Sequence, residues 1–401
     1  MGLEELLHRH RFESHPFDTW IAESEKSLPE WFVPPAFLKS VAGDSGGTKL
    51  TPRSHLVFGR PGDGKTAIRL TLERELETRA PDTLVLRYID FSRPLASNRR
   101  PSIADHADEI LRLGTIGLIS VWQVEPERYS GLNIGQKADL ASLIDRYYEQ
   151  LPAQSRETYA SRISPLNNRV KRFLTSGVKA AVEAYNVTIS VLKKEKIVPT
   201  QWAAPAGSNA EGPDDPLLRI QRFWAVANAF GVESVWILVD KVDESPGTQG
   251  VNAIFECIAD LLLTQTLLEF RVDEKQVICF KAFLTNPTDL RPMLKDAGFR
   301  TDRIKSELIA WTRKDLDEAL RKRLAHFSNH NVDHFDQLCA PEASGTHDAL
   351  LDACELRPRT LFRIAHEIFA ELQRNGDRTT DKLSKSMVEI GIKAGKEAVV
   401  G

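Results

Sequence analysis

The chain has 401 residues, 42% of them hydrophobic and 27% charged, a balance that is typical of globular proteins and excludes a disordered or fibrous chain. Its 53 Lys and Arg residues against 56 Asp and Glu residues give a formal net charge of −3, which excludes a wholly basic nucleic-acid-coating protein. The longest strongly apolar runs, such as residues 235–239, are far shorter than the roughly 20 residues that a membrane span needs, so we expect no membrane partner.

The cysteines and the N-terminal residues predict a cytoplasmic protein. The four cysteines are widely spaced and form neither a CxxC pair nor a Cys/His cluster, so the sequence predicts no disulfide framework and no zinc site. The N-terminal residues lack the apolar run of a signal peptide. The cysteines are Cys257, Cys279, Cys339 and Cys354.

The first half of the chain predicts two strands followed by a long helical stretch. Residues 1–50 are interrupted by prolines and a Gly-rich loop. Residues 54–59 and 83–91 predict strands, with a helix over 65–79 between them. The stretch 95–230 shows no convincing strand. Within it, apolar residues recur at helical spacing over 103–124, 136–151, 168–193 and 217–230, and residues 203–216 have the composition of a linker.

Strands return in the second half. Residues 235–240 form an apolar run that ends in an acid, and a helix is predicted over 250–270. Further strands are predicted over 276–284 and 307–311. Apolar strands that alternate with helices indicate a parallel sheet covered on both faces. After about residue 313 the pattern is all-helical, over 313–328, 345–355, 358–373 and 380–397.

The most specific motif lies between the first predicted strand and its helix. Residues 59–66 match G-x-x-x-x-G-K-[ST] at every fixed position, in the strand–loop–helix context that this motif requires. Glycines let backbone N–H groups surround phosphate oxygens, and the helix N-terminus adds a positive dipole. Lys65 would reach the β- and γ-phosphates, and the Thr66 hydroxyl would ligate Mg²⁺. The predicted nucleotide-binding residues are Gly59, Arg60, Pro61, Gly62, Asp63, Gly64, Lys65, Thr66 and Ala67.

A phosphate-binding loop needs an acid that holds the metal ion. Asp240 ends the apolar strand and suits that role together with Thr66. Many P-loop ATPases place a catalytic Glu directly after this Asp, but Lys241 stands there. Asp243 and Glu244 are the alternative bases for activating water, with Glu244 preferred. A charged loop without a catalytic role is the other interpretation.

These features together resemble the AAA+ and STAND-type P-loop ATPases, closest to the bacterial and archaeal proteins related to the origin-recognition initiators. The resemblance rests on the strand and loop at 54–66, the Asp240 strand, the strand at 276–284 and the C-terminal helices. It covers about 50–93 and 230–375, and it implies ATP as the nucleotide. No base-reading motif is visible in the sequence.

The same resemblance implies residues that sense the nucleotide. Asn286, after the strand 276–284, resembles the sensor 1 residue, although Asn before a proline is also an ordinary turn signal. Arg303 or Arg300 resembles an arginine finger that reaches a neighbour's nucleotide, and the alternative is two solvated surface arginines. Arg359 follows Pro358 at the predicted start of a lid helix and resembles sensor 2.

We therefore expect an α/β fold, with a three-layer P-loop NTPase core around a parallel sheet, a large helical insertion and a C-terminal helical lid. The expected regions are an N-terminal extension (1–50), the first part of the core (51–94), the insertion (95–230), the second part of the core (231–312), and the lid with the C-terminal helices (313–401).

The expected function is Mg²⁺-dependent ATP binding and hydrolysis by a molecular switch. The resemblance implies a homo-oligomer that controls a partner or effector protein, as in bacterial antiviral defence. Two alternatives stay open: a scaffold that binds ATP without hydrolysing it, which Lys241 would mark, and a DNA-loading ATPase. The net charge does not indicate nucleic acid, and the small basic clusters at 169–172 and 193–196 are more typical of solvated faces.

Overall fold

The structure is a computed structural model, and it describes residues 2–44, 46, 49–96, 99–147, 215–285, 287–375 and 382–400. Five sequence predictions lie outside the described residues: the helix over 168–193, the linker 203–216 except its last two residues, the basic clusters at 169–172 and 193–196, and Asn286. The chain divides into two compact units, Met1–Arg100 with Trp236–Gly401, and Pro101–Val235.

A parallel sheet of five strands carries the site, in the order β2-β3-β6-β1-β7. Strand β1 lies parallel between β6 and β7, and its Leu56 pairs with Ala282 on one side and Ser306 on the other. Because β6 separates β1 from β3, the carboxyl ends of these three strands meet at one edge of the sheet. The strands are β1 (His55–Phe58), β2 (Thr83–Tyr88), β3 (Ser234–Val239), β6 (Ile278–Leu284) and β7 (Lys305–Leu308).

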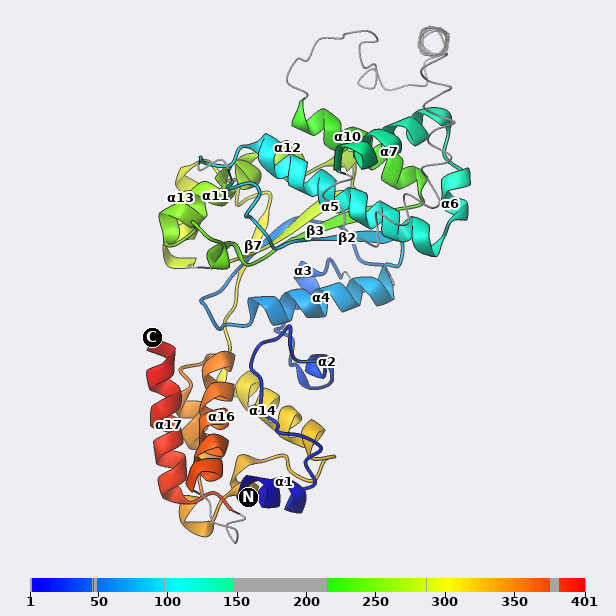
Figure 1. Cartoon of the computed structure of the whole chain (residues 1–401). Coiled ribbons are helices and arrows are strands. Elements are labelled where there is room, and N and C mark those ends of the chain that lie inside the picture. Colours follow the sequence, from blue (N-terminus) through cyan, green and yellow to red (C-terminus); the bar gives the residue numbers. More distant parts are fainter. Residues whose placement is uncertain are drawn as a thin grey trace, which may run out of the picture. The chain divides into compact units, whose positions relative to one another are not determined.

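Helices cover both faces of this sheet. On one face α4 (Lys65–Arg79) packs against β2 and β6, and on the other α12 (Gln265–Leu268) packs against β6 (Figure 1). Helices α11 (Val251–Leu263) and α13 (Pro287–Asp296) pack against each other. The predicted α/β P-loop NTPase fold is confirmed: β1, β3 and β6 are buried throughout, which accounts for their continuous apolar sequence.

Several elements of the core differ from the sequence prediction. The helix predicted over 250–270 is divided at Thr264 into α11 and α12, and the strand predicted over 83–91 ends at Tyr88. The strand predicted over 276–284 begins at Ile278, because the residues before it form a short hairpin of β4 (Arg271–Val272) and β5 (Lys275–Gln276). The final strand spans Lys305–Leu308 instead of 307–311, and its last contact with β1 is the Ile309 N–H, which donates to the Phe58 carbonyl at 2.8 Å. Trp311 then donates its indole N–H to the Asp63 carbonyl at 2.8 Å.

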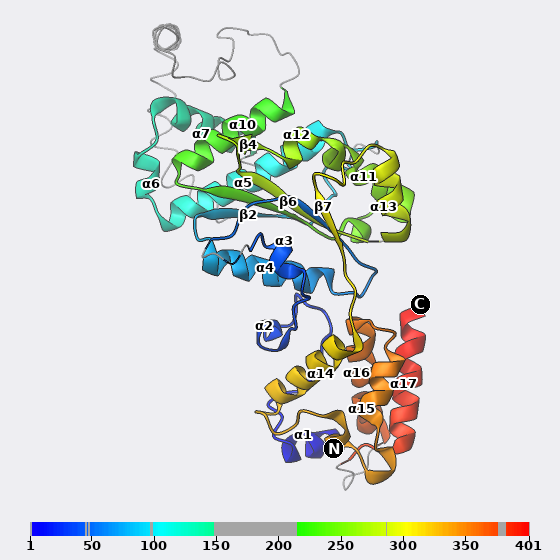
Figure 2. The same ribbon diagram turned by 180° about the vertical axis from the view of Figure 1, so that it is seen from behind.

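The C-terminal region is mainly helical, as predicted, with two short 3-10 turns between its helices (Figure 2). A capping box between Thr312 and Asp315 starts the first of these helices. The last two pack so closely that a Cβ on Gly391 would lie 2.6 Å from the Ile368 side chain. The helices are α14 (Arg313–Phe327), α15 (Thr346–Ala353), α16 (Pro358–Asn375) and α17 (Lys385–Val400).

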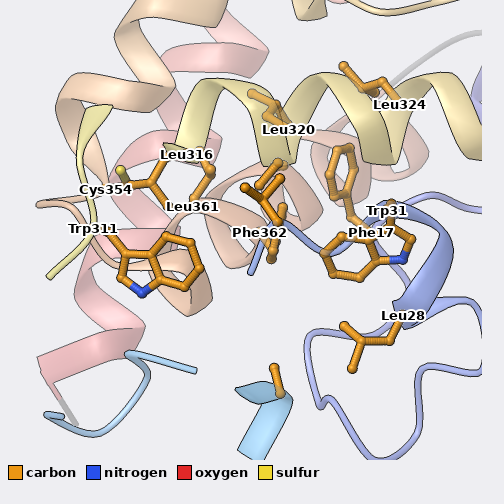
Figure 3. Close-up of a cluster of buried hydrophobic side chains, with 14 of the residues drawn as sticks. Phe17, Leu28, Trp31, Trp311, Leu316, Leu320, Leu324, Cys354, Leu361 and Phe362 are labelled. Carbon is orange, nitrogen blue, oxygen red and sulfur yellow. The ribbon is translucent and has the colours of Figure 1, made fainter. Parts of the chain in front are cut away.

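The N-terminal region is an integral part of the lid's apolar core. It contains α1 (Gly2–Arg9), α2 (Leu28–Trp31) and α3 (Leu38–Val41). Phe17 and Trp31 lie among Leu320 of α14 and Phe362 of α16, and all four side chains are buried (Figure 3). The segment from Pro16 to Val33, which we call the N-terminal segment, is therefore held in place by packing.

The second unit is helical in its described part. It contains α5 (Ile103–Val124), α6 (Glu127–Ser130), α7 (Ile134–Tyr147) and α10 (Pro216–Ala229). Helices α5 and α10 approach closely at Gly114, where a Cβ would lie 2.5 Å from the Phe223 ring. Asp108 accepts hydrogen bonds from the Tyr147 hydroxyl at 2.9 Å and from Arg219 at 2.8 Å, which ties α5 to α7 and α10. None of the helices that the structure describes combines the length and apolar composition needed to cross a membrane.

Candidate nucleotide-binding site

A pocket of about 490 Å³ opens beside the loop that follows β1, a volume within the usual range of small-molecule sites. Four parts of the first unit line it: the phosphate-binding loop with the start of α4, the residues after β3, the N-terminal segment, and the lid. Lys65, Thr66 and Asp240 lie on its polar side, and Trp20 and Phe32 contribute aromatic surface. The pocket therefore has a polar side and an apolar side.

The loop presents unpaired backbone donors to this pocket. Gly62 and Gly64 both have φ of +87°, a conformation that glycine adopts without strain. The first hydrogen bond of α4 runs from the Ile68 N–H to the Gly64 carbonyl at 3.0 Å, so the first N–H groups of the helix have no intrahelical partner. Those groups belong to residues 65–67, which line the pocket. Such a helix terminus is suited to binding phosphate.

Lys65 and Asp63 fix the shape of the loop from within. The Lys65 Nζ donates to the Gly59 carbonyl at 3.1 Å, and its side chain is 9% exposed. The buried Asp63 carboxylate accepts the Arg60 N–H at 2.7 Å. Because the lysine's hydrogen-bond partner is a neutral carbonyl, it can turn to a phosphate without breaking a strong ion pair.

Thr66 and Asp240 form the pair that the sequence assigned to Mg²⁺. The Thr66 hydroxyl donates to Asp240 Oδ2 at 3.1 Å, and the backbone N–H of Lys241 donates to Oδ1 at 3.0 Å. Since the hydroxyl hydrogen is used by Asp240, the lone pairs of Thr66 Oγ1 remain for a metal ion. Mg²⁺ prefers such hard oxygen ligands, so these two residues fit the ion.

The residues after Asp240 turn their side chains in different directions. Lys241 has φ of +62°, and its Nζ lies 2.7 Å from Glu23 Oε2. In the short turn that follows, Asp243 Oδ2 lies 3.9 Å from the Lys65 Nζ, and its side chain is 21% exposed. The Glu244 side chain is 61% exposed and lies 3.6 Å from Lys241. Both acids line the pocket, but Asp243 is the one that lies beside Lys65, which favours it over Glu244.

The lid contacts the phosphate-binding loop at the start of α16. The backbone N–H of Arg359 donates to the Gly62 carbonyl at 3.4 Å, and Arg359 lines the pocket. Arg300 pairs with Asp302 at 2.7 Å, Arg303 lies 3.6 Å from Glu269, and both arginine side chains are about half exposed. Among the described residues neither arginine lines this pocket. The other predicted sensor, Asn286, has no described position.

An ionic cluster that the sequence did not predict surrounds Thr66 and Asp240. Arg69, one turn into α4, is 2% exposed and donates to Asp240 Oδ2 at 2.9 Å. It also contacts Glu23 at 3.2 Å and Glu73. Burial acts to lower the pKa of Arg69, but Glu73 and Asp240 outweigh it and raise that pKa. Arg69 follows Lys65 by four residues, a helical spacing that points to this face, whereas nothing in the local sequence signals Glu23.

A second missed residue links the N-terminal segment to the lid. Arg323 of α14 is 1% exposed, pairs with Glu25 at 2.6 Å and donates to the Thr19 carbonyl at 2.9 Å. Its guanidinium lies 4.2 Å from the centre of the Trp31 ring. Burial lowers the pKa of Arg323 to about 10. Both Arg323 and Trp31 line the pocket, so the contacts between the N-terminal segment and the lid form one of its walls.

No protein-family model and no curated protein matches the sequence. Among solved structures, the chain is similar to the ORC2 protein of Aeropyrum pernix, solved as ADPNP–ADP complexes. The two are 12% identical, the match covers 96% of this chain and 73% of the other, and the TM-score is 0.40. A likeness of this degree does not establish a shared fold or function, so the site is assigned from its own residues.

Proposed function

We propose that this protein binds ATP with Mg²⁺ in the pocket beside α4 and hydrolyses it as a nucleotide-dependent switch. The observation that carries the proposal is the Thr66–Asp240 pair, which lies next to the unpaired N–H groups at the start of α4. Phosphate donors, a lysine and a pair of metal-binding oxygens in one pocket are the parts that phosphoryl transfer needs.

Each of these residues has a distinct role in the proposed reaction. Residues 65–67 bind phosphate oxygens through their N–H groups, and Lys65 Nζ neutralises phosphate charge. Thr66 and Asp240 would hold Mg²⁺, which would neutralise further phosphate charge. Asp243, near the Lys65 ammonium, accepts the proton of the attacking water. Arg359 places a permanent positive charge on the lid side of the pocket.

The apolar side of the pocket suits a purine base. Trp20 and Phe32 line it from the N-terminal segment, and aromatic rings bind bases by stacking. Stacking does not distinguish adenine from guanine. The choice of ATP over GTP therefore rests on the resemblance to AAA+ ATPases.

Titration calorimetry with ATP and Mg²⁺ tests the proposal on the full chain. The wild type is expected to bind one ATP, and Lys65→Ala is expected to lose most of that affinity. Lys295→Ala is the matched control, because Lys295 is an exposed lysine on α13. Wild-type protein that binds no ATP, or equal losses in both variants, would overturn the proposal.

The alternative function is a scaffold that holds ATP without turnover, and one observation favours it. Lys241, at the place of the usual catalytic Glu, is held by Glu23 and does not supply a carboxylate. Phosphate release separates the two functions: ATP binding without release supports the scaffold. Release that Asp243→Asn strongly reduces supports the hydrolysing switch.

We also propose that the protein forms a homo-oligomer and controls a partner protein, as in bacterial antiviral defence. The half-exposed Arg300 and Arg303 support the oligomer, because an arginine finger must be accessible to a neighbour. Light scattering with and without ATP tests assembly, and a monomer under both conditions contradicts it. The DNA-loading alternative predicts DNA affinity that falls steeply with salt.

A further inference from the structure

Arg69 is the buried centre of the ionic cluster beside the proposed metal site. Its guanidinium contacts three carboxylates, those of Asp240 at 2.9 Å, of Glu23 at 3.2 Å and of Glu73. With a side-chain exposure of 2%, it is excluded from solvent, as is Asp240 at 1%. A buried arginine with several fixed partners holds its neighbours in one arrangement.

The Asp240 carboxylate is held from three sides. Oδ2 accepts from the Thr66 hydroxyl and from Arg69 Nε, and Oδ1 accepts from the Lys241 backbone N–H. Thr66 and Lys241 each supply a neutral donor, whereas Arg69 supplies a charged one, which forms the stronger hydrogen bond. Arg69 therefore fixes the oxygen that Thr66 also contacts.

Glu23 connects this arrangement to the N-terminal segment. Its Oε1 accepts from Arg69 at 3.2 Å and its Oε2 from the Lys241 Nζ at 2.7 Å. Arg69 donates to the Asp240 carboxylate, and Lys241 directly follows Asp240 in the chain. The two oxygens of the Glu23 carboxylate therefore contact two residues that neighbour Asp240. Glu73, by contrast, is also paired with Arg87 at 2.8 Å and belongs to α4 itself.

We propose that Arg69 is a positioning residue for Thr66 and Asp240, the two residues assigned to Mg²⁺. Glu23 makes this positioning depend on the N-terminal segment. The inference rests on the proposed binding of Mg²⁺ and ATP. Residues that orient a metal ligand from outside the coordination sphere typically change metal affinity by about 10-fold to 100-fold when substituted. Arg69 donates to Asp240, a proposed metal ligand, and would itself lie outside the coordination sphere of the ion.

A purely electrostatic role of Arg69 predicts the opposite result. A cation near the site repels Mg²⁺, so its removal would strengthen metal binding. Loss of positioning weakens metal binding instead, because the Asp240 carboxylate is then free to turn away from Thr66. The sign of the change in metal affinity therefore distinguishes the two roles.

The test measures the dissociation constant of a fluorescent ATP analogue in Mg²⁺ and in EDTA. The ratio of the dissociation constant in EDTA to that in Mg²⁺ reports the metal's contribution alone, since general damage to the pocket weakens binding under both conditions. We expect Arg69→Met to reduce this ratio about 10-fold. We expect Glu23→Gln to reduce it less. Glu75→Gln is the control, because Glu75 is a half-exposed acid on the same helix that pairs with Arg79.

An unchanged or increased ratio in Arg69→Met overturns the inference while leaving the proposed function standing. Wild-type protein that fails to bind the analogue, or binds it equally with and without Mg²⁺, overturns both. Thermal melts show whether Arg69→Met folds. If it does not, Glu23→Gln decides, because the Glu23 side chain is 32% exposed and its replacement leaves Arg69 paired with Asp240 and Glu73. A ratio in Glu23→Gln equal to that of Glu75→Gln then contradicts the inference.

Discussion

The Thr66 hydroxyl donates a hydrogen bond to Asp240 Oδ2 at 3.1 Å, although 174 positions separate the two residues in the chain. The topology of the sheet brings them together. Thr66 lies at the start of α4, directly after β1, and Asp240 directly follows β3. These strands lie on either side of β6 in one parallel sheet, so their carboxyl ends share an edge.

Replacing Asp243 by Asn is expected to lower the ATP turnover rate about 100-fold, the usual contribution of a general base. The carboxylate lies 3.9 Å from the Lys65 Nζ, and the amide keeps its shape without its basicity. Glu244→Gln is expected to leave turnover nearly unchanged, since its side chain is 61% exposed. Phosphate release under saturating ATP measures both. Equal losses in the two variants would assign the base role to neither residue.

Replacing Trp20 by Ala is expected to weaken ATP binding about 10-fold, because base stacking on an aromatic ring contributes roughly 1–3 kcal/mol. Binding of inorganic tripolyphosphate should not change, since that ligand has phosphates but no base. Competition against a fluorescent ATP analogue measures both affinities. If ATP and tripolyphosphate lose affinity equally, Trp20 supports the pocket without contacting the base.

The phosphate-binding side of the site was predictable because its signals are local. The motif at 59–66 is contiguous, and the helix predicted over 65–79 has the same bounds as α4. Asp240 was predictable as an acid at the end of an apolar strand. Asp243 and Glu244 were not separable in advance, because a single turn determines which of two adjacent carboxylates lies near Lys65.

The remaining features depend on tertiary packing that no local pattern encodes. Glu23 reaches Arg69 and Lys241 only because the N-terminal segment packs against the lid and the core. Helix α13 was missed for a different reason. It follows a turn signal and contains Pro292, a residue that usually interrupts helices.

Removing the tie between the N-terminal segment and the lid is expected to destabilise the fold. Arg323→Met leaves the buried Glu25 without its guanidinium partner, and such a loss costs about 3–5 kcal/mol. Arg321→Met, two positions away on α14, removes the same charge from a partly exposed pair with Asp317 and should cost less than about 1 kcal/mol. Chemical denaturation followed by tryptophan fluorescence measures both. Similar losses in the two variants would refute a special role for Arg323.

Replacing Lys281 by Met is expected to stabilise the fold at pH 7. Lys281 lies fully buried in β6, 3.1 Å from the His55 ring and 4.6 Å from the centre of the Trp236 ring, and burial lowers its pKa from 10.5 to about 8. The folded state therefore loses this proton before the unfolded state does, and the group adds stability as pH rises from about 8 to 10.5.

The variant should lack that rise, and at pH 7 it should gain at most about 3.5 kcal/mol, since each pKa unit corresponds to about 1.4 kcal/mol and burial lowers the pKa of Lys281 from 10.5 to about 8. Urea unfolding at several pH values measures the difference between wild type and variant. Lys305→Met on β7, an exposed position, is the control. If the free energy of unfolding depends on pH in the same way for wild type and Lys281→Met, the lowered pKa of Lys281 is contradicted.

Calorimetric titration of the wild-type chain with ATP, once in Mg²⁺ and once in EDTA, tests whether this pocket is a Mg²⁺–ATP site. The structure predicts one binding site per chain, with clearly tighter binding in Mg²⁺, because Thr66 and Asp240 contribute only when the metal is present. Absence of binding, or equal affinity in Mg²⁺ and EDTA, would contradict the assignment of this pocket as a Mg²⁺–ATP site.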